Sequence, residues 1–283
     1  MFDYNTAFSR NIGWITGDER EIIKNTTIAL AGLGGAGGEH ALTLARMGFQ
    51  KFHLSDFDEF EVHNFNRQAG AYISTLNQPK CRVMANMIRD INPDAVVKEF
   101  PDGINKENVD EFFENVDIYV DGIDFFALEA RKLVYQKAED MGIPNLLAAP
   151  IGMGVALAIF TKDSMSYSDY YQFNDDNDGE ENFIKLLIGL APALMHTSYL
   201  VDASAANFQE KRGPSTPMAI KLCSGLLVSN VVKLVLGRGK VIVAPKVMQF
   251  DAYKNKFKTS WCPFGNGGPI QKLKFAIARK QVM

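Results

Sequence analysis

The 283-residue sequence is poor in cysteine and has no long uninterrupted apolar run. Its three cysteines, Cys81, Cys223 and Cys262, are odd in number, and no two of them form a CxxC pair. This count argues against a disulfide scaffold and against a paired-cysteine zinc site. The first residues lack the basic and apolar regions of a secretory signal peptide. The most apolar stretch, 218–236, is interrupted by polar residues, so we interpret it as a buried or amphipathic helix. The predicted location is the cytoplasm.

The chain also lacks a large excess of either charge. Thirty Lys and Arg residues oppose 33 Asp and Glu residues, which gives a net charge of −3. A mildly acidic protein has no global electrostatic attraction to nucleic acid or to an anionic membrane, so we expect neither as a partner. Hydrophobic residues make up 47 % of the sequence, which is enough for a sizeable core and excludes a wholly disordered chain.

Short apolar runs alternate with helical patterns over the first 160 residues. The first two runs, 27–31 and 51–55, flank a glycine-rich turn and a helix, and therefore form a βαβ unit with parallel strands. The pattern continues with predicted strands over 95–100, 116–120, 144–148 and 154–161 and predicted helices over 80–91, 108–115 and 128–141. This alternation predicts a Rossmann-like, doubly wound α/β fold with a mostly parallel sheet.

The regular alternation ends after residue 162, where we expect a mixed C-terminal extension. We interpret residues 1–283 as one domain with a nucleotide-binding core over 8–160. A mobile crossover segment is predicted over 164–182, because the run 174–181 is acidic and has no apolar residue. Residues 183–283 are predicted to supply helices over 183–196 and up to residue 236, followed by a closing strand over 247–257.

A glycine-rich sequence lies directly after the first predicted strand. Gly32, Gly34 and Gly37 fit the pattern GxGxxG at the start of a helix, with Gly35 inside the loop. The first glycine permits a tight turn, the second lets the backbone approach a phosphate, and the third lets the helix pack on the strand. Asp56 ends the second strand, where a carboxylate can accept hydrogen bonds from ribose hydroxyls. We therefore predict nucleotide binding at this edge of the sheet.

Further polar residues follow other strands at the same edge. Asp58, Asn64 and Arg67 follow the second strand, Lys80 opens the next helix, and Asp124 follows a later strand. In a doubly wound sheet these strand ends converge on one crevice. Cations and a carboxylate there suit a triphosphate with its magnesium ion. A dinucleotide such as NAD would leave Arg67 and Lys80 without a role.

This order of motifs resembles the ThiF/MoeB and ubiquitin-activating-enzyme family of adenylyltransferases. The resemblance covers about residues 8–160, with a weaker similarity in the helix over 217–236, and the segment 8–11 resembles the family's N-terminal arginine motif. It implies that a substrate carboxylate attacks the α-phosphate of ATP, so that pyrophosphate leaves and an acyl-adenylate forms. The expected substrate is the C-terminus of a small β-grasp protein, either ubiquitin-like or a sulfur carrier.

The resemblance also implies residue roles. Asn64, Arg67 and Lys80 would contact the phosphates of ATP, and Asp124 would position Mg²⁺. Arg10 would act as an arginine finger that reaches the site of the other subunit in a homodimer. The glycine loop would hold the nucleotide and Asp56 its ribose, whereas Asp58 belongs to the DxD motif without a defined role.

Three departures mark a divergent member of such a family. The zinc-binding CxxC pairs of many relatives are missing, so we expect no zinc and predict that aromatic residues stabilise the tail instead; these are Tyr167, Tyr170, Tyr171 and Phe173. No cysteine lies in the crossover segment, which predicts adenylation without a covalent cysteine intermediate. Phe125 stands where relatives often have Asn, and Arg131 lies later than usual.

Structural alternatives remain for several of these residues. Arg67 alone could be a surface salt-bridge residue, Cys81 a packing residue and Asp121 a turn cap. For the whole protein, the rival functions are a non-catalytic scaffold that binds a nucleotide or a partner and, with less support, an NAD(P)-dependent oxidoreductase.

Overall fold

The computed structural model describes residues 1–174, 179–205 and 213–282. Their strands form one eight-stranded sheet in the order β3-β2-β1-β4-β5-β6-β7-β8. The five strands from β3 to β5 run parallel, and β6, β7 and β8 continue the sheet in antiparallel fashion. The strands are β1 Thr27–Ala31, β2 Lys51–Ser55, β3 Val96–Phe100, β4 Ile118–Asp121, β5 Asn145–Ile151, β6 Gly154–Phe160, β7 Lys246–Asp251 and β8 Lys256–Trp261. The predicted fold class, a Rossmann-like and mostly parallel sheet with a mixed extension, is confirmed.

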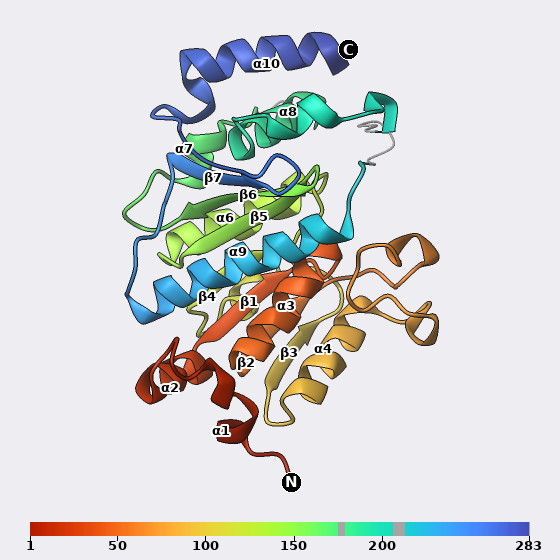
Figure 1. The fold of residues 1–283 in the computed structure, drawn as a ribbon, viewed down its shortest axis with the longest axis vertical. Coiled ribbons are helices and arrows are strands. Elements are labelled where there is room, and N and C mark those ends of the chain that lie inside the picture. The colour runs from red at the N-terminus through yellow and green to blue at the C-terminus, as the bar shows by residue number, and fades with distance from the viewer. Residues whose placement is uncertain (175–178, 206–212, 283) are drawn as a thin grey trace.

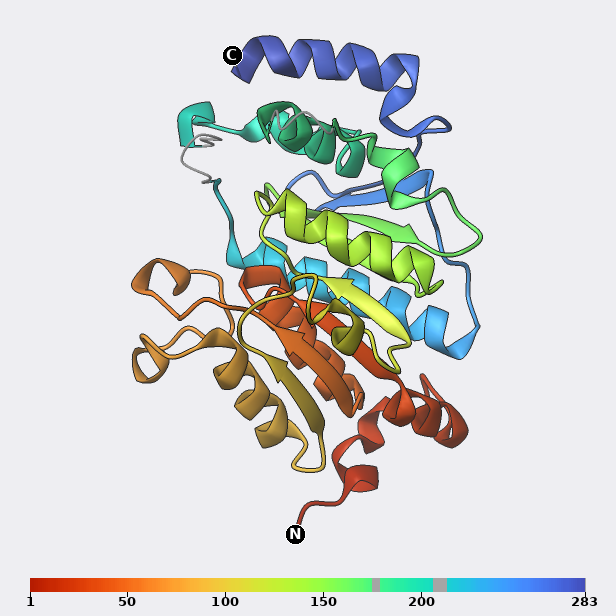
Figure 2. The same ribbon diagram turned by 180° about the vertical axis from the view of Figure 1, so that it is seen from behind.

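Helices cover both faces of the sheet. One face carries α3 Gly35–Met47, α4 Lys80–Ile91 and α9 Pro217–Leu236 (Figure 1). The opposite face carries α5 Val109–Phe112, α6 Leu128–Asp140, α7 Tyr167–Tyr171 and α8 Gly179–Leu190 (Figure 2). The short helices α1 Tyr4–Ala7 and α2 Gly17–Asn25 lie near the N-terminus, and α10 Pro269–Val282 packs on α8 at the far end of the molecule.

Strand β1 shows why the sequence folds this way. Ile28 and Leu30 point into one core, beneath α3, α4 and α9, whereas Ala29 and Ala31 point into the other. Successive side chains of a strand alternate between faces, so a strand buried on both sides is read as a continuous apolar run. The predicted boundaries of β1, β2 and α4 agree with the structure.

Helix α9 is the apolar helix predicted from the sequence. Pro217 occupies its first turn, and Gly237 ends it in the left-handed conformation with a φ of 60°. By length and composition α9 could cross a membrane. In the fold it packs against α3, β5 and β6, and its inward side chains belong to the core.

Several predicted boundaries in the C-terminal part are wrong. The expected single closing strand is a hairpin, β7 and β8, whose turn contains Asn255 with a φ of +52°. Helix α8 begins at residue 179 and ends at 190, so 179–181 of the predicted acidic loop are helical, while 175–178 lie outside the described residues. Helix α10 was not expected, because its alternation of apolar and basic residues gave no clear boundary.

The crossover segment over 164–182 contains helix α7, which is packed into the core. Tyr167, Tyr170 and Tyr171 of this helix are buried, and Phe173 stacks on Tyr171 with 5.4 Å between ring centroids. These are the aromatic residues predicted to stabilise the tail. The rings of the three tyrosines also contact Phe160 of β6, so α7 is fixed to the sheet.

Candidate nucleotide-binding site

The glycine loop joins β1 to α3 at the carboxyl edge of the sheet. Gly32 has a φ of +85°, and a Cβ atom there would lie 2.2 Å from the carbonyl oxygen of Gly122. A Cβ atom at Gly37 would lie 1.8 Å from the Gly32 carbonyl oxygen, so both glycines are required for close packing. At Gly34 the nearest atom would be a Gln68 side-chain nitrogen at 3.7 Å, which leaves the backbone open to approach.

Helix α3 therefore presents its N-terminus at an open surface. Gly34 is the N-cap and has no side chain to accept hydrogen bonds from the first turn of the helix. Such free N–H groups, together with the positive end of the helix dipole, form an anion site. Gly35 completes the surface, because a Cβ atom there would lie 2.9 Å from Ile220 of α9 and 3.5 Å from Cγ of Arg67.

Asp56 ties the second strand to this loop. Its Oδ2 accepts a hydrogen bond of 2.6 Å from the Leu33 backbone N–H, and its Oδ1 accepts one of 2.9 Å from Asp58 N–H. Burial raises the pKa of the Asp56 carboxyl, against the opposing effects of the Leu33 hydrogen bond and the Lys80 charge. Carboxylate oxygens have further lone pairs, so Asp56 can still accept from a ribose hydroxyl.

Lys80 and Asp58 form a pair beside Asp56. The Lys80 Nζ lies 2.9 Å from Asp58 Oδ2, and the Lys80 backbone N–H donates to the Asp58 carbonyl. The Lys80 side chain is 7 % exposed, whereas that of Asp58 is 54 % exposed. The second Asp of the DxD motif therefore holds the lysine in place, a role that could not be assigned from the sequence.

Arg67 lies on the other side of the glycine loop. Its Nη1 donates to the His63 carbonyl and to Asn66 Oδ1, both at 2.9 Å. No carboxylate pairs with it in the part of the chain that the structure describes, so the salt-bridge alternative finds no partner. Buried Asn64 shapes this turn, because its carbonyl accepts the backbone N–H groups of Arg67 and Gln68.

The loop after β4 brings Asp124 to the same edge. Asp124 is exposed, and its Oδ1 accepts the Phe126 backbone N–H at 2.9 Å. Sequence reasoning missed how the loop is held. Arg131 and Asp121 are both buried, with Nε and Oδ2 2.7 Å apart, and Arg131 also donates to the Ile123 and Phe125 carbonyls. The only sign of this pair in the sequence was that an arginine, Arg131, follows ten residues after Asp121.

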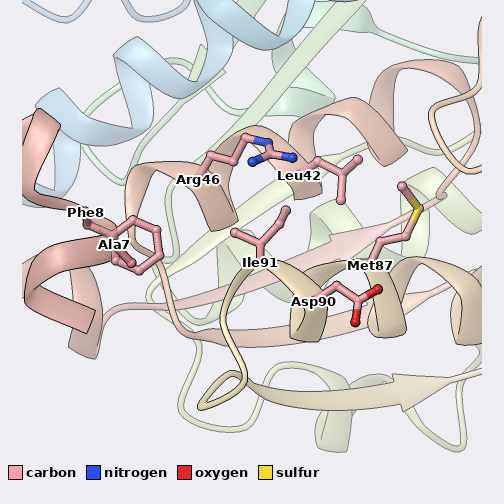
Figure 3. A pocket seen from close by; sticks show the side chains of 7 residues that line it. All are labelled: Ala7, Phe8, Leu42, Arg46, Met87, Asp90 and Ile91. Atoms are coloured by element: carbon pink, nitrogen blue, oxygen red, sulfur yellow. The ribbon is translucent and has the colours of Figure 1, made fainter. Parts of the chain in front are cut away.

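Arg10 does not join the other predicted site residues within one chain. It lies in a 3₁₀ turn, Ser9–Asn11, whose Asn11 side chain donates to the Met47 carbonyl at the C-terminal end of α3. The glycine loop is at the opposite end of this 13-residue helix, about 20 Å away. The pocket at that end, between α1, α3 and α4, contains Arg46 and Asp90 but no predicted site residue (Figure 3).

Comparison with known protein families shows to which family the sequence belongs. The sequence profile of the ThiF family matches residues 8–264. The chain belongs to the ThiF family. The predicted resemblance is thereby confirmed, and the match extends well beyond residue 160 to include α9 and the β7–β8 hairpin.

Curated relatives of this ThiF protein match over part of their length. It is 38 % identical to the tRNA threonylcarbamoyladenosine dehydratase of Bacillus subtilis over 41 % of this chain and 46 % of the relative. It is 28 % identical to the molybdopterin-synthase adenylyltransferase of Haemophilus influenzae over 51 % of this chain and 58 % of the relative. The chain thus spans about half the length of the curated relatives it matches.

Solved structures share the ThiF fold over most of the chain. E. coli MccB with ATP matches with a TM-score of 0.66 and 17 % identity, covering 93 % of this chain and 75 % of MccB. E. coli tRNA N6-threonylcarbamoyladenosine dehydratase matches with a TM-score of 0.61 and 19 % identity, covering 82 % and 95 %. At these identities the likeness supports the fold alone.

The residues of the ThiF site fit a magnesium ion only together with a nucleotide. Within the described ranges, no group of three or more His, Cys, Asp or Glu side chains is arranged to hold a metal ion. Mg²⁺ commonly keeps several waters and binds through one or two carboxylates plus substrate phosphates. Exposed Asp124 meets that requirement as a single carboxylate at the edge of the site.

Proposed function

We propose that this ThiF-family chain catalyses the ATP-dependent adenylation of a carboxylate. The phosphates would lie on the N-terminus of α3, between Arg67 on one side and Lys80 on the other. Asp56 would hold the ribose, and Asp124 would hold Mg²⁺, which supplies charge neutralisation to the phosphates when bound. Mg²⁺ binding and the roles of the individual residues are part of this proposal.

The position of Arg67 is the observation that carries the proposal. Its side chain crosses Gly35 at the N-terminus of α3, and it has no carboxylate partner among the described residues. A cation beside the positive end of a helix dipole is unfavourable unless an anion lies between them. A triphosphate supplies that anion. The diphosphate of a dinucleotide would supply an anion there as well, so the titration with NAD described below separates the two nucleotides.

The chemistry asks little of the protein beyond charge and orientation. A carboxylate is already a nucleophile at neutral pH, so its attack on the α-phosphate requires no strong general base. Arg67 and Lys80 would stabilise the charge that builds up on the phosphate oxygens, an electrostatic contribution worth about 10²–10³ in rate for each donor. Lys80 would turn from Asp58 toward the phosphates, and the exposed Asp58 carboxylate would return to solvent.

The acceptor is proposed to be the C-terminus of a small ubiquitin-like or sulfur-carrier protein. The molybdopterin-synthase adenylyltransferase among the relatives favours this class by its name. Another relative is named for a modified tRNA nucleoside, whose threonyl group also carries a carboxylate. Both classes present a carboxylate, so one assay with two kinds of acceptor separates them.

Calorimetric titration with Mg·ATP and, separately, with NAD tests the nucleotide assignment. We expect wild type to bind Mg·ATP and not NAD, and Arg67→Ala to weaken Mg·ATP binding strongly. Arg82→Ala is the matched control, because Arg82 is an exposed arginine of α4 that pairs with Glu99 3.6 Å away, outside the site. NAD binding without a response to ATP would overturn the proposal. Binding of neither nucleotide would favour the non-catalytic scaffold.

Pyrophosphate exchange tests the acceptor. A β-grasp protein with a free C-terminal carboxylate should support exchange, whereas the same protein with a C-terminal amide should not. Threonylcarbamoyladenosine in tRNA is the second acceptor to be tried. Exchange with the tRNA alone would replace the protein acceptor in the proposal while leaving the adenylation step intact.

The homodimer and the role of Arg10 are proposed together. Because Arg10 lies at the far end of α3 from its own glycine loop, it could serve only the site of a second copy. Arg10→Ala and Arg67→Ala should each be inactive alone. Mixing them should restore activity, because a heterodimer contains one site with both arginines. No recovery on mixing, with dimerisation shown by ultracentrifugation, would exclude this role for Arg10.

A further inference from the structure

The charge of the chain is divided unevenly between two parts. Residues 238–283 contain ten Lys and Arg residues and a single acidic residue, the buried Asp251. Their net charge is +9, and the remaining residues, 1–237, carry −12. The whole-chain value of −3 hides this division. A local basic surface of this strength attracts polyanions even when the protein is acidic on average.

The basic residues gather on the β7–β8 hairpin and on α10. Lys254, Lys256 and Lys258 are exposed, and none has a carboxylate partner within the described ranges. On α10, Lys274 is half-buried, and its Nζ donates to the Pro192 carbonyl and to Gln271 Oε1. Elsewhere in the fold, cations such as Lys98 and Lys137 are paired with Glu or Asp. The hairpin therefore carries free positive charge.

Exposed aromatic rings are interspersed with these lysines. Tyr253 is 62 % exposed, Phe257 55 %, Trp261 67 % and Phe264 64 %. Phe257 and Trp261 point to one face of β8, and Lys256 and Lys258 point to the other. Because β8 is the edge strand of the sheet, a ligand that follows the strand can reach both sets of side chains.

We propose that β8 and its hairpin turn bind a single-stranded nucleic acid, with phosphates on Lys254, Lys256 and Lys258 and bases stacked on Phe257 and Trp261. Aromatic platforms within a basic groove are the usual way in which proteins hold single strands. The two rings are four residues apart on an extended strand, about 13 Å, a distance that two nucleotide steps of an extended single strand span. An acidic protein would pair with the lysines but leaves the flat exposed rings unexplained.

The surface adjoins the nucleotide-binding edge. Strand β7 runs parallel to β5 and β4, so the β7–β8 turn opens at the same edge as Asp56 and Asp124. Four strand spacings separate β4 from β8, about 20 Å. The proposal goes beyond adenylation and stands without it. It also reverses the expectation, drawn from net charge alone, that nucleic acid is not a partner.

Tryptophan fluorescence gives a direct test. The chain has two tryptophans, so Trp14→Phe leaves Trp261 as the reporter. We expect the oligonucleotides rU12 and dT12 to quench Trp261 saturably, with an affinity that falls as salt rises. The relative affinity of the two distinguishes RNA from DNA as the natural strand. Neither measurement uses ATP, so failure of the adenylation proposal cannot be mistaken for failure here.

Two sets of variants separate phosphate contacts from stacking. In anisotropy titrations with labelled rU12, the triple variant Lys254→Gln/Lys256→Gln/Lys258→Gln should lower the slope of log K against log salt by about 2. Trp261→Ala should weaken rU12 binding about 10- to 100-fold. The matched control removes three lysines from another surface, Lys106→Gln/Lys132→Gln/Lys137→Gln, and should bind like wild type.

The results that would overturn the proposal are equally specific. Absence of quenching by both oligonucleotides at low salt would exclude binding at β8. Equal loss of binding in the control triple variant would show that only overall charge matters. Poly-L-glutamate that quenches Trp261 as tightly as rU12 would assign the surface to an acidic protein instead. The altered side chains of the hairpin and of Trp14 and Trp261 are exposed, so thermal melting should be unchanged in these variants. The control variant is compared at its own melting temperature, because Lys132 and Lys137 are partly buried and paired with Glu129 and Asp110.

Discussion

The Arg131–Asp121 pair offers the sharpest test of how the site is supported. Both side chains are almost completely buried, at 1 % and 0 % exposure, and their closest atoms are 2.7 Å apart. Arg131→Met keeps the length of the side chain but removes its charge and three hydrogen bonds, to Asp121 and to the Ile123 and Phe125 carbonyls. The Asp121 carboxylate is then left in the core without a cation.

The expected cost follows from this uncompensated charge. Breaking a buried ion pair on one side typically destabilises a protein by about 3–5 kcal/mol, whereas replacing both partners by uncharged groups costs much less. Arg131→Met should therefore lose about 3–5 kcal/mol of unfolding free energy, a large part of the roughly 5–15 kcal/mol of an ordinary domain. The double variant Arg131→Met/Asp121→Asn should recover much of the loss. Mg·ATP affinity should fall in the single variant, because the same pair fixes the loop that carries Asp124.

The double-mutant cycle consists of wild type, Arg131→Met, Asp121→Asn and the double variant. Urea unfolding of these four proteins measures the coupling free energy between the two side chains. Arg82→Met is the control, since its ion pair with Glu99 is at the surface, and should cost less than about 1 kcal/mol. A loss below 1 kcal/mol in Arg131→Met, or losses that simply add in the double variant, would refute the argument.

Three further predictions concern single residues. Gly37→Ala should destabilise the fold by at least about 1–3 kcal/mol, because its Cβ would lie 1.8 Å from a backbone oxygen. Gly34→Ala should fold normally and weaken the binding of Mg·ATP. Equal melting temperatures of the two variants would contradict this prediction. Burial lowers the pKa of His40 to about 3, so the unfolded chain takes up a proton that the folded protein does not. The unfolding free energy of wild type should therefore fall by about 1.4 kcal/mol per pH unit relative to His40→Leu between pH 6 and 4, and parallel pH profiles of the two proteins would contradict this. Tyr171→Ala should cost about 3–5 kcal/mol in urea unfolding, and a value near zero would show that α7 is not fixed by its aromatic packing.

The parts of the fold that the sequence predicted share one property. Strands such as β1 and β2 are buried on both faces, so their apolar runs and the glycines after them are visible in a single sequence. The acidic start of α8 misled the prediction, because Glu180 and Glu181 favour a helix N-terminus as much as a loop. The β7–β8 turn was missed, because it contains no glycine; its left-handed position is occupied by Asn255.

The candidate site was predictable where a motif fixes a residue's place at a strand end. Asp56 and Lys80 lie where the βαβ pattern places them. The pairing of Lys80 with Asp58, and of Arg131 with Asp121, joins side chains across loops whose path the sequence does not specify. Ile220 illustrates the same limit, since nothing in the sequence links a residue of α9 to Gly35.

The contact between Ile220 and the glycine loop has a consequence for synthesis on the ribosome. One wall of the nucleotide site comes from a helix that lies almost two hundred residues after the loop, and the Ser224 hydroxyl donates to the Glu39 carbonyl from the same helix. A nascent chain that has emerged only through β6 contains every residue of the glycine loop and the other motifs. It lacks helix α9, which supplies Ile220 beside the loop and packs on β5 and β6. Nucleotide binding should therefore begin only after α9 has left the exit tunnel, late in translation.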